Sequence, residues 1–132
     1  MTEKTVVIAL GGNAIRQHNE KGTITEQIAN VRRASRQIAQ IAADGYTVAV
    51  THGNGPQVGD ILLRNELTEK TLPAMPLDVC GAESQGMIGY LLQQSMREAL
   101  RAAGVDRPVV TVLTQTVVND DDPAFGRPEK PV

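Results

Sequence analysis

Aromatic residues are scarce in this 132-residue chain, which has no tryptophan, one phenylalanine and two tyrosines. So few rings cannot supply the stacking platforms on which proteins bind single-stranded nucleic acid. The formal net charge of -2 also gives no basic footprint for nucleic acid in general. We therefore expect no nucleic-acid partner.

Cysteine and long apolar runs are scarce as well. The single cysteine, Cys80, has no partner for an internal disulfide, and no signal peptide is recognisable, so we expect a cytoplasmic protein. No apolar run approaches the roughly 20 residues that span a bilayer, so we expect no membrane partner. No base is identifiable for Cys80, which is expected to be a small buried residue rather than a nucleophile.

Hydrophobic residues make up 41% of the chain and charged residues 21%, which is typical of a globular domain with a core. Thr5–Leu10 is a continuous apolar run of the kind that is buried on both faces of a parallel sheet. Tyr46–Thr51 and Pro108–Leu113 are predicted to be the second and third strands. Strands that alternate with helical patterns predict an α/β fold with a doubly wound sheet.

Helices are predicted between these strands by their end signals and spacing. Thr23 and Glu26 match a capping box, which opens a helix that Gly45 closes as the glycine after its last turn. Helical patterns also cover residues 57–67, after a proline suited to a first turn, and residues 77–103.

Two glycine-rich turns follow the first two strands. Gly11, Gly12 and Asn13 end the first strand, and Gly53-Asn54-Gly55-Pro56 ends the second. A tight connection alone would explain the first turn about as well as binding of a phosphate. The first turn is not a dinucleotide-binding motif, since no third glycine follows in the required spacing, and it is not a Walker loop, since no Gly-Lys-Ser/Thr follows.

The second turn holds more residues of special conformation than a connection needs. Because the carboxyl ends of parallel strands share one edge of the sheet, both turns are expected to lie together there. Backbone N–H groups at such strand ends and helix starts bind anions. Gly11, Gly12, Asn13, Gly53, Asn54 and Gly55 are therefore our candidates for binding phosphate and substrate in a phosphoryl-transfer site.

Two other groups of polar residues are given structural roles. His52 beside the second turn is expected to make a hydrogen bond behind the loop. Asp120–Asp122 stand at a loop tip, where consecutive carboxylates are usually solvated, so we expect no metal site in this chain. After Asn119 the chain becomes polar and rich in proline. Residues 1–119 are thus expected to form one α/β domain and residues 120–132 the incomplete start of a protruding loop or subdomain, in a chain that stops inside a longer protein.

Three stretches resemble carbamate kinase, of the amino-acid kinase superfamily: VVIALGGNA at Val6–Ala14, THGNGPQVG at Thr51–Gly59 and MPLDVCGAESQGMIGYLLQ at Met75–Gln93. They occur in the family's order, and THGNGPQVG is highly specific. Family members are longer, so the chain resembles the amino-terminal part. The resemblance implies a three-layer αβα sandwich with a mainly parallel sheet, truncated before the nucleotide-binding half.

The resemblance also implies an activity, phosphoryl transfer between ATP and carbamate to give ADP and carbamoyl phosphate. Gly11, Gly12 and Asn13 would contact the transferring phosphoryl group, with Asn13 in a catalytic role. Gly53 and Asn54 would hold carbamate or its phosphorylated form. The nucleotide would bring its Mg²⁺ to a site mostly in the absent half, so the 132-residue chain alone is expected to be inactive.

The second catalytic candidate is Lys130. It aligns with a family lysine in the protruding subdomain that reaches back over the reacting groups. Other amino-acid kinases often carry a lysine two residues before the glycine pair, where this chain has Ala9. Because a transferring phosphoryl group needs cationic stabilisation, Lys130 is expected to supply it from elsewhere.

The helix around Gly81–Leu100 has apolar positions on more than one face, and the resemblance implies a homodimer formed through this helix. Two alternatives stay open. The chain could belong to another acyl-phosphate-forming amino-acid kinase, such as one for acetylglutamate, or it could be a non-catalytic association module.

Overall fold

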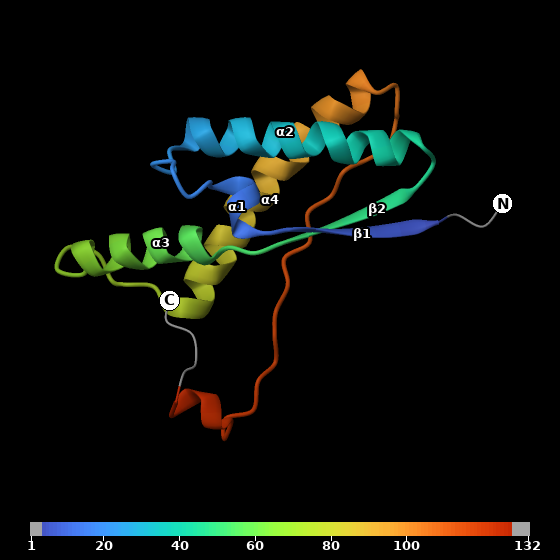
Figure 1. Ribbon diagram of the computed structural model, residues 1–132. Helices are drawn as coiled ribbons and strands as arrows, with labels where there is room; N and C mark the ends of the chain where they lie inside the picture. Colours follow the sequence, from blue (N-terminus) through green and yellow to red (C-terminus); the bar gives the residue numbers. More distant parts are fainter. Residues whose placement is uncertain (1–3, 128–132) are drawn as a thin grey trace.

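The computed structural model describes residues 4–127, and its centre is a two-stranded parallel sheet (Figure 1). Strand β1 (Thr5–Leu10) pairs with β2 (Thr47–His52) from Thr5 opposite Thr47 to Leu10 opposite His52. The predicted first strand is confirmed with its bounds, and the second is confirmed with a shift of one residue. Both strands therefore end at the same edge, beside the two glycine turns.

In the described part of the chain, four α-helices accompany the sheet: α1 (Gly12–Ile15), α2 (Ile24–Ala43), α3 (Gly55–Thr68) and α4 (Leu77–Ala102). A short 3-10 helix, η1 (Pro123–Phe125), follows near the end of the described chain. The three longer helices confirm the predicted ones to within two residues at each end. The single turn of α1 was not predicted, since four residues carry no periodic pattern. No helix in residues 4–127 is long and apolar enough to cross a membrane.

Helix α2 begins and ends where the sequence predicts. The Thr23 hydroxyl accepts a hydrogen bond from the Glu26 N–H at 3.3 Å, and the Glu26 carboxylate accepts one from the Thr23 N–H at 2.8 Å. This reciprocal pair satisfies two N–H groups that the first turn of a helix leaves free. Gly45 follows the helix with φ +95, a left-handed conformation that favours glycine.

The core lies on one face of the sheet, where α2 packs against α4, which crosses it (Figure 1). Side chains alternate along each strand, so Ile8 and Leu10 of β1 and Val48 and Val50 of β2 point to this face. They contact a cluster of buried side chains from the two helices: Ile38, Ala39, Ala42, Met96, Ala99 and Leu100. In a second cluster, Ile15 of α1 packs against side chains of α2 and α4. A third cluster packs α3 against the start of α4.

The other face of the sheet is open in residues 4–127. Val7 is 69% exposed, and Ala9, Ala49 and Thr51 are also exposed. The predicted α/β class with a parallel sheet is confirmed. Of the three layers expected, the described residues supply the sheet and the helical layer on one face.

The prediction of a third strand at Pro108–Leu113 is wrong for this structure. That segment is extended, but its backbone is held by side chains of α4 instead of a neighbouring strand. Gln93 donates to the Val109 carbonyl at 2.9 Å, and the Gln85 carboxamide bonds both the N–H and the carbonyl of Thr114. Apolar, β-branched composition shows that a segment fits a sheet, whereas pairing needs a partner strand at the right place.

Candidate functional site

The structure brings the two glycine turns into contact at the carboxyl edge of the sheet. The Gly53 N–H donates to the Leu10 carbonyl at 3.2 Å, which continues the strand pairing into the turns. The Pro56 ring lies against Gly12, where an added Cβ would be 3.6 Å from the proline Cδ. The starts of α1 and α3 are therefore neighbours.

Glycine at this edge is required neither by backbone conformation nor by neighbouring atoms of residues 4–127. An added Cβ at Gly11, Gly53 or Gly55 would meet no atom within 4 Å, and at Gly12 it would make an ordinary contact. None of the four has a left-handed backbone, since the positive φ values of the described chain belong to Gly22, Gly45 and Gly104. The absence of side chains thus leaves open space beside backbone groups, which a bound ligand needs.

Backbone donors face this space. The N–H groups of Gly12, Asn13, Gly55 and Gln57 have no acceptor among the described residues. Pro56, the second residue of α3, has no N–H of its own. These free donors at the start of the 14-residue helix α3 favour an anionic ligand.

Asn54 and Asn13 are placed differently, although both belong to the predicted site. The Asn54 side-chain Nδ2 donates to the hydroxyl of Ser84 on α4 at 2.7 Å. Asn13 is exposed and has no partner among residues 4–127. The sequence analysis missed Ser84, which lies 30 residues from Asn54 and has no motif of its own. Lys130 lies outside the described residues.

The loop of residues 16–22, which follows α1, is braced to two helices, and the sequence analysis missed this as well. Arg16 forms an ion pair with Asp60 of α3 at 3.2 Å. Asn30 of α2, which is 4% exposed, donates to the Ile15 carbonyl at 3.2 Å and to the Glu20 carboxylate at 2.6 Å. These contacts hold the first turn in place from behind.

The remaining polar candidates have local roles. His52 Nδ1 lies 3.1 Å from the Gly53 carbonyl oxygen, which is the kind of contact expected behind the loop. Cys80 is fully buried, as predicted, and its Sγ lies 3.5 Å from the Met75 carbonyl oxygen. Between residues 4 and 127, no three His, Cys, Asp or Glu side chains are grouped to hold a metal ion.

Among residues 4–127, Glu26 of the capping box is the titratable group with a clear pKa shift. The Thr23 hydroxyl, and then the Thr23 N–H, hold the pKa of its carboxyl below the usual value, because both donate to the ionised form. This shift belongs to the start of α2 and not to the glycine turns.

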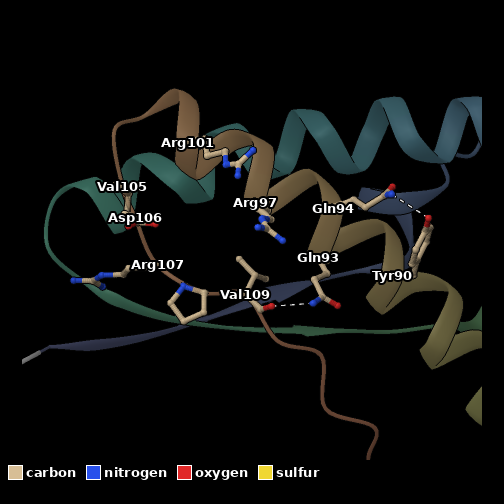
Figure 2. A pocket seen from close by; sticks show the side chains of 10 residues that line it. Tyr90, Gln93, Gln94, Arg97, Arg101, Val105, Asp106, Arg107 and Val109 are labelled. Atoms are coloured by element: carbon tan, nitrogen blue, oxygen red, sulfur yellow. Dashed lines mark hydrogen bonds between the residues drawn. The ribbon is translucent and has the colours of Figure 1, made fainter.

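A hollow of about 660 Å³ lies away from the turns, along the C-terminal half of α4 and the segment after it (Figure 2). In Figure 2, Arg97 and Arg101 reach into the same space, while Gln93 is bonded to the Val109 carbonyl. Tyr90, at the other end, accepts a hydrogen bond from Gln94 at 3.0 Å. The hollow is therefore separate from the site at the glycine turns. It lies on the exposed side of α4, the helix through which we predict that a dimer forms.

Comparisons with known proteins agree with this geometry. A profile of the amino acid kinase family matches residues 4–124. Carbamate kinase from Pyrococcus furiosus is 54% identical over 131 residues, which cover 98% of this chain and 42% of the relative. Carbamate kinase from Trichomonas vaginalis is 52% identical over 128 residues, covering 96% of this chain and 41% of the relative. The chain spans less than half the length of these relatives.

Solved structures give the same result. The structure of Giardia carbamate kinase superposes with a TM-score of 0.93 at 49% identity, covering 100% of this chain and 44% of that one. Giardia lamblia carbamate kinase bound to AMP-PNP superposes with a TM-score of 0.91 at 49% identity, covering 98% of this chain and 46% of that one. The chain therefore belongs to the amino acid kinase family and is similar over its length to the amino-terminal portion of carbamate kinases.

Proposed function

We propose that the full-length protein transfers a phosphoryl group between ATP and carbamate, forming ADP and carbamoyl phosphate. The observation that carries the proposal is the open edge where four glycines leave space beside unbonded N–H groups at the starts of α1 and α3. The carbamate kinases that match this chain at about half of its residues support the same reaction.

In the direction of ATP formation, a terminal phosphate oxygen of ADP attacks the phosphorus of carbamoyl phosphate. The bond from phosphorus to the carbamate oxygen breaks, and carbamate leaves as an anion without a proton. The N–H groups of Gly12 and Asn13 would bind the oxygens of the transferring phosphoryl group, and those of Gly55 and Gln57 would hold the carbamoyl end. Fixed donors of this kind stabilise charge that spreads over the transition state.

The remaining parts of the proposed machinery lie outside the described residues. Lys130 would add a cation over the reacting groups, which Ala9 cannot supply. The AMP-PNP complex of the Giardia enzyme supports ATP or ADP as the nucleotide. The donor set in residues 4–127 does not fit Mg²⁺ on its own, so we propose that the ion enters with the nucleotide.

The test is an assay of the full-length protein with carbamoyl phosphate and ADP, in which ATP formation is followed by a coupled enzyme. We expect turnover with carbamoyl phosphate and none with acetylglutamyl phosphate. Turnover with acetylglutamyl phosphate instead would favour another acyl-phosphate-forming amino-acid kinase. No turnover with either compound, together with folded protein, would favour the association module. The 132-residue chain alone is expected to show no activity, since positioning of the nucleotide is lost.

We also propose that the protein forms a homodimer through the exposed side of the helix around Gly81–Leu100. This side includes Tyr90, Gln93 and Arg97, which are exposed and line the hollow of Figure 2. Tyr90→Glu in the full-length protein should lower the mass measured by light scattering to that of a monomer. Few apolar side chains are exposed on this side of the helix.

A cytoplasmic location of the protein also stays a prediction.

A further inference from the structure

Two carboxamides are buried between the starts of α2 and α3. Gln57, the third residue of α3, is 3% exposed, and Gln27, the fourth residue of α2, is 7% exposed. The Gln57 Nε2 donates to the Gln27 Oε1 at 3.2 Å, and the Gln27 Nε2 donates to the Gly22 carbonyl at 2.8 Å. A chain of hydrogen bonds therefore runs from α3 through α2 to the end of the loop of residues 16–22.

The Gly22 carbonyl determines the direction of both bonds in this chain. A carbonyl only accepts, so Gln27 turns its NH₂ group toward Gly22 and its side-chain oxygen toward Gln57. Gln57 must then present its own NH₂ group to Gln27, which leaves its oxygen Oε1 at the other end. This oxygen is buried and has no hydrogen-bond partner among residues 4–127. An unpaired buried acceptor destabilises the folded state, a cost that apolar side chains of similar shape would avoid.

The loop of residues 16–22 is tied to one side of α3 at both of its ends. Arg16, at its start, forms the ion pair with Asp60, which lies about one helical turn from Gln57. Gly22, at its end, is tied to Gln57 through the chain of hydrogen bonds. Gly22 has φ +79, and an added Cβ would lie 2.5 Å from Arg16 Nε, so the two ends of the loop also pack against each other. Because the loop directly follows α1, its attachment to α3 places the first glycine turn relative to the second.

We infer that Gln27 and Gln57 are positioning residues, whose paired amides hold the two glycine turns at the separation that phosphoryl transfer needs. The inference rests on the proposed function, in which the first turn binds the transferring phosphoryl group and the second holds the carbamoyl end. The backbone of Gln57 belongs to the start of α3, whereas its side chain is bonded toward the loop behind the first turn. Loss of the amide pair would let the two sets of N–H donors shift apart, and a misplacement of about 1 Å slows a reaction strongly.

The experiment replaces both amides in the full-length protein by methionine, which has a similar length and no amide. Gln27→Met/Gln57→Met removes the unpaired acceptor and keeps every backbone N–H, so the melting temperature should stay within about 3 °C of the wild type or rise. The kcat for ATP formation from carbamoyl phosphate and ADP should fall about tenfold, with the KM for carbamoyl phosphate within about twofold, because each turn still binds its own part of the substrate. Gln37→Met/Gln40→Met, at two exposed amides of α2, is the matched control and should change none of these quantities.

Hydrogen exchange measures the same positioning without turnover. The Ala14 N–H donates to the Gly11 carbonyl at 2.9 Å, and the Arg16 N–H donates to the Gly12 carbonyl at 2.9 Å, so exchange of these two groups reports on the first turn. In Gln27→Met/Gln57→Met their exchange should be about threefold faster or more, although neither substitution lies in the first turn. The control should exchange at the rate of the wild type.

The outcomes separate this inference from the proposed function. If the wild-type protein forms no ATP from carbamoyl phosphate, the proposed function fails and the inference fails with it. If the wild type is active and the amide-pair variant keeps its kcat, the inference alone is overturned. A kcat and a melting temperature that fall together would show that the pair is merely structural, and a lower kcat without faster exchange in the first turn would show that it acts elsewhere. Either result overturns the inference, while the proposed function stands.

Discussion

The two glycine turns end neighbouring strands and contact each other, yet they are held in different ways. The first turn leads into α1, which has four residues, and is fixed by Ile15 beneath it and by the loop of residues 16–22 behind it. The second turn leads directly into α3, which has 14 residues, and is fixed by the hydrogen bond from Asn54 to Ser84.

From this difference we propose different roles for the two turns in the site. Aligned peptide dipoles sum along a helix, so α3 gives the second turn a lasting positive field, whereas a single turn such as α1 adds little. The first turn therefore contributes individual N–H groups and the free Asn13 side chain. We expect it to adapt to the phosphoryl group as that group moves, while the second turn keeps the carbamoyl end in place.

The largest expected effect is on the support of the first turn. Ile15 is fully buried and packs with Val31, Ile88, Leu91 and Leu92. Ile15→Ala should lower the free energy of unfolding of the full-length protein by about 2–5 kcal/mol, since it leaves a cavity between α1, α2 and α4. Ile24→Ala is the control, because Ile24 is 52% exposed and its truncation should cost far less in the same denaturant titration. Equal losses would show that α1 is not anchored through Ile15.

Gly12 provides the next test, of function rather than stability. An added Cβ would make only an ordinary contact with Pro56, so Gly12→Ala should change the free energy of unfolding by less than about 1 kcal/mol. It should lower kcat/KM for carbamoyl phosphate about 10²-fold, because the methyl group displaces the phosphoryl group from the N–H donors. Gly59→Ala in α3, with open space around it, is the control that should retain activity. Normal kinetics in Gly12→Ala would mean that the first turn is only a connection.

Sequence alone predicted what depends on neighbouring residues. The capping box at Thr23 and Glu26 spans one helical turn, and β1 is one uninterrupted apolar run, so both were found with their bounds. The edge that the two turns share followed from the rule for parallel strands. These features need no knowledge of distant parts of the chain.

The missed features all depend on contacts between distant residues. Asn54 and Ser84 are 30 residues apart, and Arg16 and Asp60 are 44 apart, so neither pair forms a pattern in the sequence. The failed third strand has the same origin, because composition cannot show that Gln85 and Gln93 will take the backbone bonds of the segment beside them. How the site is oriented was therefore less predictable than where it lies.

Asn30 tests whether the first turn is held by polar contacts as well as by packing. Asn30→Leu removes the donor to the Ile15 carbonyl and to Glu20, and should cost about 1–3 kcal/mol in the free energy of unfolding. Gln37→Leu, an exposed amide on the same helix, is the matched control with a change close to zero. A cost as small as that of Gln37→Leu would leave Ile15 as the sole support.

Thr23 tests the start of α2, directly after the bracing loop. Thr23→Ala should lower the free energy of unfolding by about 1 kcal/mol, as is usual for loss of a helix cap. The pKa of Glu26 is lowered in the folded protein, so its contribution is present above its ordinary value of 4.5 and is lost as the pH falls through the lowered value. The difference in the free energy of unfolding between the wild type and Thr23→Ala should therefore shrink in acid. Thermal unfolding between pH 3 and 7, in steps of about one pH unit, can measure this difference. A difference that grows in acid would contradict this assignment.

The smallest expected effect concerns the ion pair that ties the loop of the first turn to the helix of the second. The side chains of Arg16 and Asp60 are 28% and 46% exposed, so water and salt screen their attraction. Asp60→Asn should cost about 0.2–1 kcal/mol in the free energy of unfolding at low ionic strength, and less in about 1 M salt. Glu66→Gln on the same helix is the control, because the exposed Glu66 has no ion pair among the described residues.

The ion pair between Arg16 and Asp60 also joins the loop behind the first turn to α3, which follows the second turn. If the two turns move together, the loss in kcat/KM caused by Gly12→Ala should be smaller in the presence of Asp60→Asn. An additive loss in the double variant would show that each turn is held on its own, by Ile15 for the first and by Ser84 for the second.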